Sequence, residues 1–197
     1  FDKMLPQCLF SNVRRIFTTG FQSEWKSTME RQLLTISPKA RLLSVDYGKN
    51  PKDYQAAPIK ITFRYEIPDY ALKGEGEMFF RPMVMNNLYN QVRSYLRIDT
   101  SVENRKYGFK DGCSRLVELD EMIQLPAGYK LVNAAKNEMM QGVGADFEGS
   151  LTQKGNKVLL HNRLALKKRV YEASDWESFR NAVNAHKAYG EYLVIKK

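Results

Sequence analysis

The chain has 197 residues, of which 43% are hydrophobic and 27% are charged, so it is neither a disordered tail nor a membrane bundle. No apolar run approaches the roughly 18 residues that a spanning helix needs. The net charge of +9 favours anionic partners in general, but the basic residues are scattered and no recognition motif accompanies them. We therefore expect neither a nucleic-acid partner nor a membrane span. The densest basic groups are Arg14-Arg15, Lys167-Lys168-Arg169 and Lys196-Lys197.

The opening stretch, FDKMLPQCLF, has neither a starting Met nor a signal-like apolar block and is typical of a piece of a longer protein. A helix is predicted at residues 22–36, where Trp25, Met29, Leu33 and Ile36 recur at helical spacing. The period then changes to two, which predicts strands. These strands cover residues 41–47, 58–67 and 74–82, whereas residues 86–97 fit a short helix or a strand equally well.

The second half of the chain predicts a series of strands separated by turns. Asp111-Gly112 is a strong hairpin signal between expected strands at 102–109 and 115–124. Gly155-Asn156 predicts a second hairpin, between residues 145–153 and 157–168. A short strand is expected at 128–132, and the final strand at 191–197.

A second amphipathic helix is predicted at residues 175–188, with Trp176, Phe179, Val183 and His186 on one stripe. Ser174 and Glu177 have the spacing of its capping box. The pattern as a whole predicts a mainly β (α+β) fold: an antiparallel β-sandwich-like architecture with two helices, at about 22–36 and 175–188. We expect an N-terminal subdomain at 1–100 and a C-terminal subdomain at 101–197, or one continuous domain.

A cysteine nucleophile needs a nearby base, normally a histidine. The chain offers Cys8 and Cys113 as thiols and only His161 and His186 as bases. His161 is out of phase with the apolar residues of its strand and is expected to face solvent or a second layer, whereas His186 lies on the apolar helix stripe, as a core or boundary histidine does. We interpret both cysteines as structural, with a disulfide between them left open. The spacing of these four residues fits no metal site.

Two further motifs suggest chemistry only superficially. Glu118, Asp120 and Glu121 could supply paired carboxylates, but Glu118 and Asp120 have the phase of a solvated strand face. The GEGE stretch at residues 74–77 resembles a phosphate loop only in its glycines and predicts a hairpin turn.

An exposed tyrosine face could bind carbohydrate, through Tyr47, Tyr54, Tyr70, Tyr89 and Tyr95.

The order of several short motifs resembles one bacterial family from about residue 20 onward. This is the region of unknown function that follows the transglutaminase-like domain in large envelope proteins of Gram-negative bacteria. The similar segments are Tyr65 to Pro68, Lys73 to Pro82, Arg105 to Phe109, Leu125-Pro126 with Gly128-Tyr129, and the tail with Tyr171, the second helix and the final strand. The chain departs from the pattern at Gly108, where a proline is expected.

The resemblance implies a non-catalytic accessory or binding domain, located in the periplasm or cell envelope. Its partners would be the upstream transglutaminase-like domain and a further protein or glycan. No position matches the family's catalytic triad, so the resemblance implies no catalytic residue, no metal and no cofactor here. The alternatives are a carbohydrate-binding module that uses the tyrosines and an enzyme that uses Cys113 with a histidine.

Overall fold

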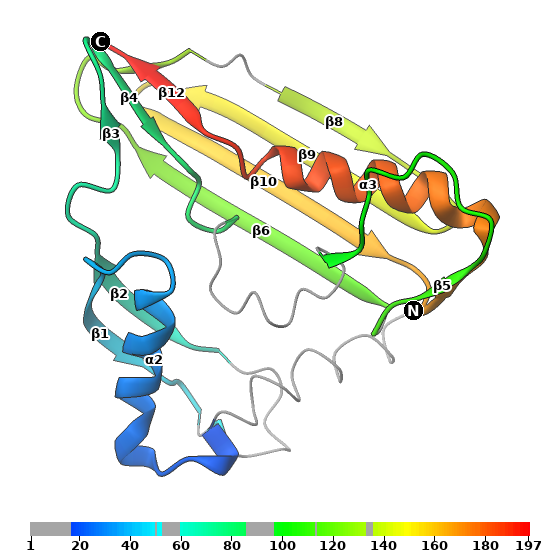
Figure 1. The fold of residues 1–197 in the computed structure, drawn as a ribbon. Helices are drawn as coiled ribbons and strands as arrows, with labels where there is room; N and C mark the ends of the chain where they lie inside the picture. The colour runs from blue at the N-terminus through cyan, green and yellow to red at the C-terminus, as the bar shows by residue number, and fades with distance from the viewer. Residues whose placement is uncertain (1–16, 50, 53–59, 86–96, 113, 133–135) are drawn as a thin grey trace. The chain divides into compact units, whose positions relative to one another are not determined.

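A computed structural model describes residues 17–49, 51–52, 60–85, 97–112, 114–132 and 136–197 (Figure 1). The chain divides into two compact units. Unit 1 comprises residues Phe1–Tyr70 and Asn87–Val92, and unit 2 comprises Ala71–Asn86 and Arg93–Lys197. No helix in these described ranges is long and apolar enough to cross a membrane.

Unit 1 contains the short 3₁₀ helix η1 (Gln22–Glu24), the helix α2 (Trp25–Leu34) and the strands β1 (Arg41–Asp46) and β2 (Thr62–Glu66). The two strands pair antiparallel, which confirms the strands expected here. Trp25, Met29 and Leu33 of α2 are buried, as their spacing predicted. Phe17 packs edge-on against Trp25, with the ring centroids 5.2 Å apart, and closes this small core.

Unit 2 is built on a four-stranded antiparallel sheet in the order β6-β10-β9-β8. Its strands are β6 (Arg115–Gln124), β8 (Lys136–Met140), β9 (Ala145–Lys154) and β10 (Lys157–Leu166). The hairpin between β9 and β10 is confirmed, and Gly155 has the positive φ of 61° that its tight turn requires.

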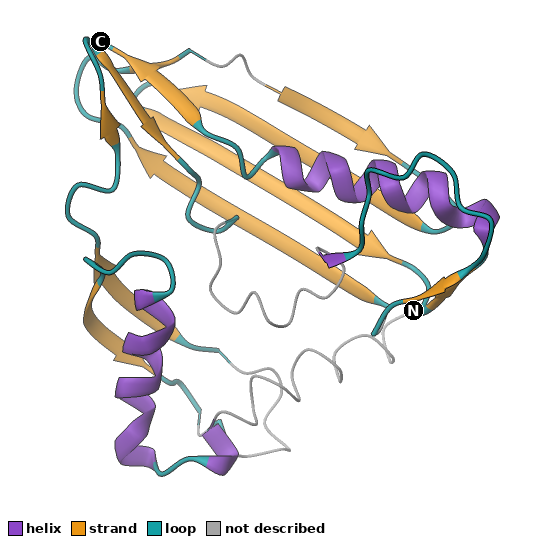
Figure 2. Ribbon diagram, viewed as in Figure 1, coloured by secondary structure: helices purple, strands orange, loops and turns teal. Residues whose placement is uncertain are grey.

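One face of this sheet is buried and the other is open. Along β10 every second residue from Val158 to Leu166 is buried, and the residues between them are half-buried. Helix α3 (Trp176–Ala188) lies across the buried face (Figure 2). A second sheet joins the same core, in the order β3-β4-β12-β7. Its strands are β3 (Leu72–Lys73), β4 (Glu77–Phe80), β7 (Lys130–Leu131) and β12 (Leu193–Lys196).

These elements confirm a mainly β fold of antiparallel sheets with two helices at the expected places. The turn at GEGE is also confirmed: the amide of Gly74 donates to the carbonyl of Glu77, 2.9 Å away, and Gly76 has a φ of 75°. Strand β4 pairs with β12, near the end of the chain.

The hairpin expected at Asp111-Gly112 is wrong. Residues 102–108 form a loop, and the short strand β5 (Phe109–Lys110) pairs with β11 (Val170–Tyr171), whereas β6 pairs with β10. Instead the buried carboxylate of Asp111 accepts a hydrogen bond from Arg115, 2.9 Å away, and the backbone amide of Asp111 donates to Arg169.

The capping box expected at Ser174 and Glu177 is also wrong. Helix α3 is preceded by the 3₁₀ turn η4 (Ala173–Asp175), so the helical segment begins earlier than its apolar stripe suggests. The carboxylate of Asp175 accepts the backbone N–H of Glu172 at 2.8 Å. Its other oxygen contacts Lys168 Nζ at 2.6 Å, and this hydrogen bond is the main reason that the pKa of Asp175 is lowered.

Candidate functional site

Residues 99–108, termed here the 99–108 loop, run along helix α3 and are fixed to it by three side chains of that helix. Trp176 Nε1 donates to the carbonyl of Val102 at 3.0 Å, and Arg180 Nε donates to the carbonyl of Thr100 at 3.1 Å. Lys187 Nζ donates to Thr100 Oγ1, also at 3.0 Å. These three hydrogen bonds anchor Thr100 and Val102, in the first part of the loop, to one face of α3.

The first turn of the loop is stabilised locally. Asp99 Oδ1 accepts the backbone amide of Ser101 at 2.9 Å and its hydroxyl at 2.7 Å. These two hydrogen bonds lower the pKa of Asp99. The pKa of Lys187, the helix residue that contacts Thr100, is lowered by burial. The acidic side chain at the start of the loop is thus already engaged by the loop itself.

Arg105 is the central side chain of this loop. Its guanidinium carbon lies 4.5 Å from the centre of the Trp176 ring and 4.9 Å from that of Phe109. The two rings meet edge to face, with centroids 5.4 Å apart, and form a fixed aromatic corner. Such cation–π contacts attract the guanidinium to the aromatic rings. Its N–H groups point outward in the plane of the group and stay available as donors.

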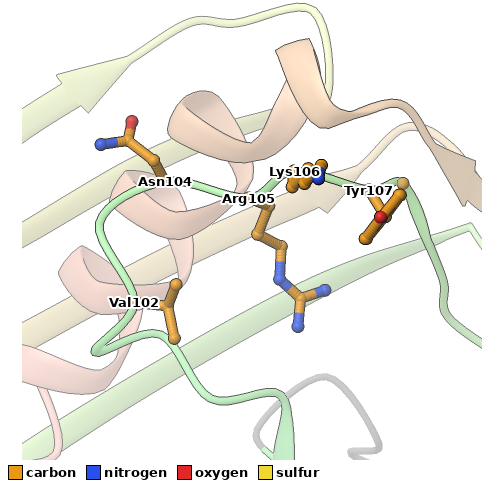
Figure 3. Close-up of a pocket in the computed structure, with 6 residues that line it drawn as sticks. Val102, Asn104, Arg105, Lys106 and Tyr107 are labelled. Atoms are coloured by element: carbon orange, nitrogen blue, oxygen red, sulfur yellow. The ribbon is translucent and has the colours of Figure 1, made fainter.

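A hollow of about 320 Å³ lies beside Arg105 (Figure 3). Lys106 Nζ lies 5.5 Å from the centre of the Tyr107 ring, which is 73% exposed. Val102 is also exposed, whereas the side chain of Asn104 points away from that of Arg105. The hollow therefore combines two cations with an aromatic and an aliphatic surface. It is lined by Val102, Asn104, Arg105, Lys106, Tyr107 and Gly108.

Gly108 ends the loop where it meets β11. A Cβ atom at this position would lie 2.5 Å from the backbone carbonyl oxygen of Tyr171, closer than real Cβ atoms approach. Proline carries the same Cβ atom, so the structure explains why glycine stands where the resemblance led us to expect proline. The close approach lets Phe109 stack on Tyr171, with centroids 4.7 Å apart.

The two histidines are far from forming one site. His161 is on the open face of the sheet, where its Nδ1 lies 2.7 Å from Asp120 Oδ1, and His186 is buried in the core against Asn162. Both placements are as expected. Among the described residues, no group of three or more His, Cys, Asp or Glu side chains could hold a metal ion. Cys8 and Cys113 lie outside the described residues.

The three carboxylates of β6 separate by face. Glu118 pairs with Arg163 on the open face, beside Asp120, which confirms the solvated face expected for both. Glu121 points to the other side, and its two oxygens accept the backbone amides of Met83 and Val84 at 3.0 and 3.1 Å. Burial raises the pKa of Glu121 in spite of these hydrogen bonds. Its position is that of a structural clamp on residues 83–84.

The expected tyrosine face is not brought together by the described residues. Tyr54, Tyr89 and Tyr95 lie outside them. Tyr47 packs against Phe17 and Trp25 in the core of unit 1, and Tyr70 is half-buried.

Of the dense basic groups in the sequence, Arg14-Arg15 also lies outside the described residues. Lys167 pairs with Asp146, and Lys168 pairs with Asp175.

Sequence reasoning missed the contribution of Arg105 and Trp176. In the sequence, the segment from Arg105 to Phe109 carries only the family resemblance, and Trp176 has only the spacing of a core residue. The sequence does carry one relevant signal: the order Arg-Lys-Tyr in an otherwise turn-like segment places two cations beside an aromatic ring. What it cannot reveal is that α3 supplies the second aromatic wall.

Residues 76–194 match the model of a family described as a domain of unknown function with a solved structure, DUF3858. The fold is similar to part of a solved structure from Parabacteroides distasonis that is provisionally described as a protease, with a TM-score of 0.51 and 12% identity. The similarity covers 62% of this chain and 24% of that chain. At this identity it supports the fold alone. No curated protein matches the sequence.

Proposed function

Because the chain belongs to the DUF3858 family, whose function is unknown, we propose its role from the site: a non-catalytic accessory domain that binds a partner through the 99–108 loop. The observation that carries this proposal is the anchoring of that loop by Trp176, Arg180 and Lys187. A loop fixed in advance loses little conformational entropy when it binds. It presents Tyr107, and arginine and tyrosine are enriched among the residues that dominate binding energy.

The two histidines support a non-catalytic role. The Nδ1 atom of His186 is hydrogen-bonded in the core, and His161 pairs with a carboxylate on an open, solvated face.

We further propose that the parent is a transglutaminase-like protein of the bacterial envelope and that this domain works in the periplasm. The support is the sequence resemblance, whose segments Lys73 to Pro82 and Arg105 to Phe109 belong to β3, β4 and the loop that carries the site. In this role the domain would position the upstream catalytic domain or hold a protein partner for it.

The test uses the full-length parent protein. Removing residues 71–197, which comprise all of unit 2 together with residues 87–92 of unit 1, should abolish capture of the partner in cross-linked cell envelopes. The double variant Arg105→Ala/Tyr107→Ala should reproduce that loss while the protein remains folded and located as before. The proposal is wrong if the deletion leaves stability, location and partner capture all unchanged.

A further inference from the structure

The hollow on the 99–108 loop has the charge and shape of an anion site. Its lining holds the cations Arg105 and Lys106 and no carboxylate. Arg105 forms no ion pair with any carboxylate in the described part of the chain. Asp99 interacts electrostatically with Arg105 from a distance, but its Oδ1 already accepts two hydrogen bonds from Ser101. The half-buried guanidinium lies 4.5 Å from the centre of the Trp176 ring and 4.9 Å from that of Phe109, and these cation–π contacts leave its N–H groups able to bind an acceptor from outside the chain.

The rest of the lining narrows the kind of anion. The guanidinium fork matches the two oxygens of a carboxylate in one plane. On either side of it the loop exposes an aliphatic side chain, Val102, and an aromatic ring, Tyr107, which are 41% and 73% exposed. These surfaces would contact an apolar group attached to the carboxylate. The volume of about 320 Å³ lies at the small end of the range for ligand pockets, about 300–1,000 Å³.

We propose that this hollow binds an organic carboxylate that carries an apolar substituent, with Arg105 as the carboxylate ligand and Val102 and Tyr107 as the apolar contacts. The inference rests on the proposal that the 99–108 loop is a binding surface. It adds the chemical class of the bound group.

The experiment is a titration of the chain followed by NMR of the Arg105 Nε–H and Trp176 Nε1–H groups. The probes are N-acetylleucine and, as the matched neutral compound, N-acetylleucinamide, at constant ionic strength set with sodium chloride. N-acetylleucine should give a saturable shift of the Arg105 resonance, and the amide should give none. Equal behaviour of the two compounds, or a linear response that chloride reproduces, would overturn the proposal.

Inorganic phosphate and glucuronate serve as two further probes in the same NMR titration. Saturation by phosphate without saturation by N-acetylleucine would mean that the site takes a different anion, and saturation by glucuronate alone would mean that it takes a sugar acid. Either result also contradicts the proposal. If N-acetylleucine fails while deletion of unit 2 still abolishes partner capture, the ligand class is wrong and the accessory role stands.

Two variants complete the test. Arg105→Gln should weaken binding of N-acetylleucine at least tenfold, because it removes a charge-assisted bidentate contact. Arg97→Gln removes the same charge from an exposed residue outside the lining and should leave binding within twofold. Protection of the Trp176 Nε1–H from hydrogen exchange shows that its bond to Val102 still anchors the loop in each variant, and the Trp176 resonance reports the titration where Arg105 is absent. Equal losses in the two variants would indicate general charge attraction and would contradict a specific site.

Discussion

His186 Nδ1 lies 2.6 Å from Asn162 Oδ1, and this hydrogen bond joins helix α3 to strand β10 inside the core. Both residues are almost completely buried, with exposed fractions of 1% and 0%. Because an amide oxygen can only accept, the geometry assigns a proton to Nδ1. The backbone carbonyl of His186 in turn lies 3.5 Å from Asn162 Nδ2.

We expect Asn162→Ala to lower the free energy of unfolding by about 1–3 kcal/mol, since it removes the acceptor from a buried N–H donor. Urea denaturation measures this change. Asn137→Ala, at an exposed position of β8, is the matched control and should stay within about 0.5 kcal/mol of the parent. Similar stability for the two variants would show that the buried contact contributes little.

Glu121→Ala tests the clamp on residues 83–84. The substitution leaves the backbone amides of Met83 and Val84 without their carboxylate acceptor, so we expect a loss of about 1–3 kcal/mol. Glu118→Ala, three residues earlier on the open face, removes only an exposed ion pair with Arg163 and should cost at most about 1 kcal/mol. Denaturant unfolding of both variants measures the difference, and the reverse order of stability would refute the clamp.

The stability of unit 2 should fall at alkaline pH because of Tyr189. Burial raises the pKa of Tyr189 to about 12, whereas an unfolded tyrosine titrates near pH 10. Between about pH 10 and 12 the unfolded chain loses this proton and the folded chain keeps it. The stabilising contribution is therefore fully present below about pH 10 and is lost as the pH rises through about 12.

Replacing Tyr189 by Phe removes this loss, so we expect the melting temperature of Tyr189→Phe to fall less steeply than that of the parent above pH 10. At neutral pH the variant should be at least as stable, because the buried hydroxyl has no hydrogen-bond partner within the described ranges. Tyr107→Phe, at an exposed tyrosine, is the control. Identical pH profiles for the two variants would argue against the raised pKa.

Gly108→Ala should loosen the end of the 99–108 loop. The added Cβ atom meets the Tyr171 carbonyl at 2.5 Å, so β5 and β11 must separate, and we expect a loss of about 1–3 kcal/mol. Thermal unfolding measures it, with Gly74→Ala as control, since a Cβ atom there finds only ordinary contacts of 3.5 Å or more. If Gly108→Ala is as stable as Gly74→Ala, the close approach does not constrain the loop.

Features set by neighbouring residues could be predicted from the sequence. The alternation of apolar and polar residues along 157–166 predicts which face of β10 is buried. Gly155 predicts the turn that pairs β10 with β9. The stripe from Trp176 to His186 gave α3, because helix periodicity depends only on residues three and four apart. The placement of His161 and His186 followed from these two patterns.

Features that depend on distant pairing could not be predicted. Asp111-Gly112 has the composition of a hairpin turn, but the Asp111 carboxylate is used by Arg115 and β5 pairs with β11 instead. The Arg105 site could not be predicted for the same reason, because its two aromatic rings, Phe109 and Trp176 of α3, lie far apart in the sequence. A sequence pattern carries no information on which far residue closes such a contact.

Photocrosslinking in living cells can show whether the 99–108 loop contacts a binding partner. A photoreactive phenylalanine analogue replaces Tyr107 in the full-length parent protein, and a second strain carries it at Tyr192, which is 45% exposed and not part of the hollow's lining. We predict a discrete crosslinked product from position 107 that is absent from position 192 and is lost with Arg105→Ala. No product at 107, or the same product from both positions, would contradict the account.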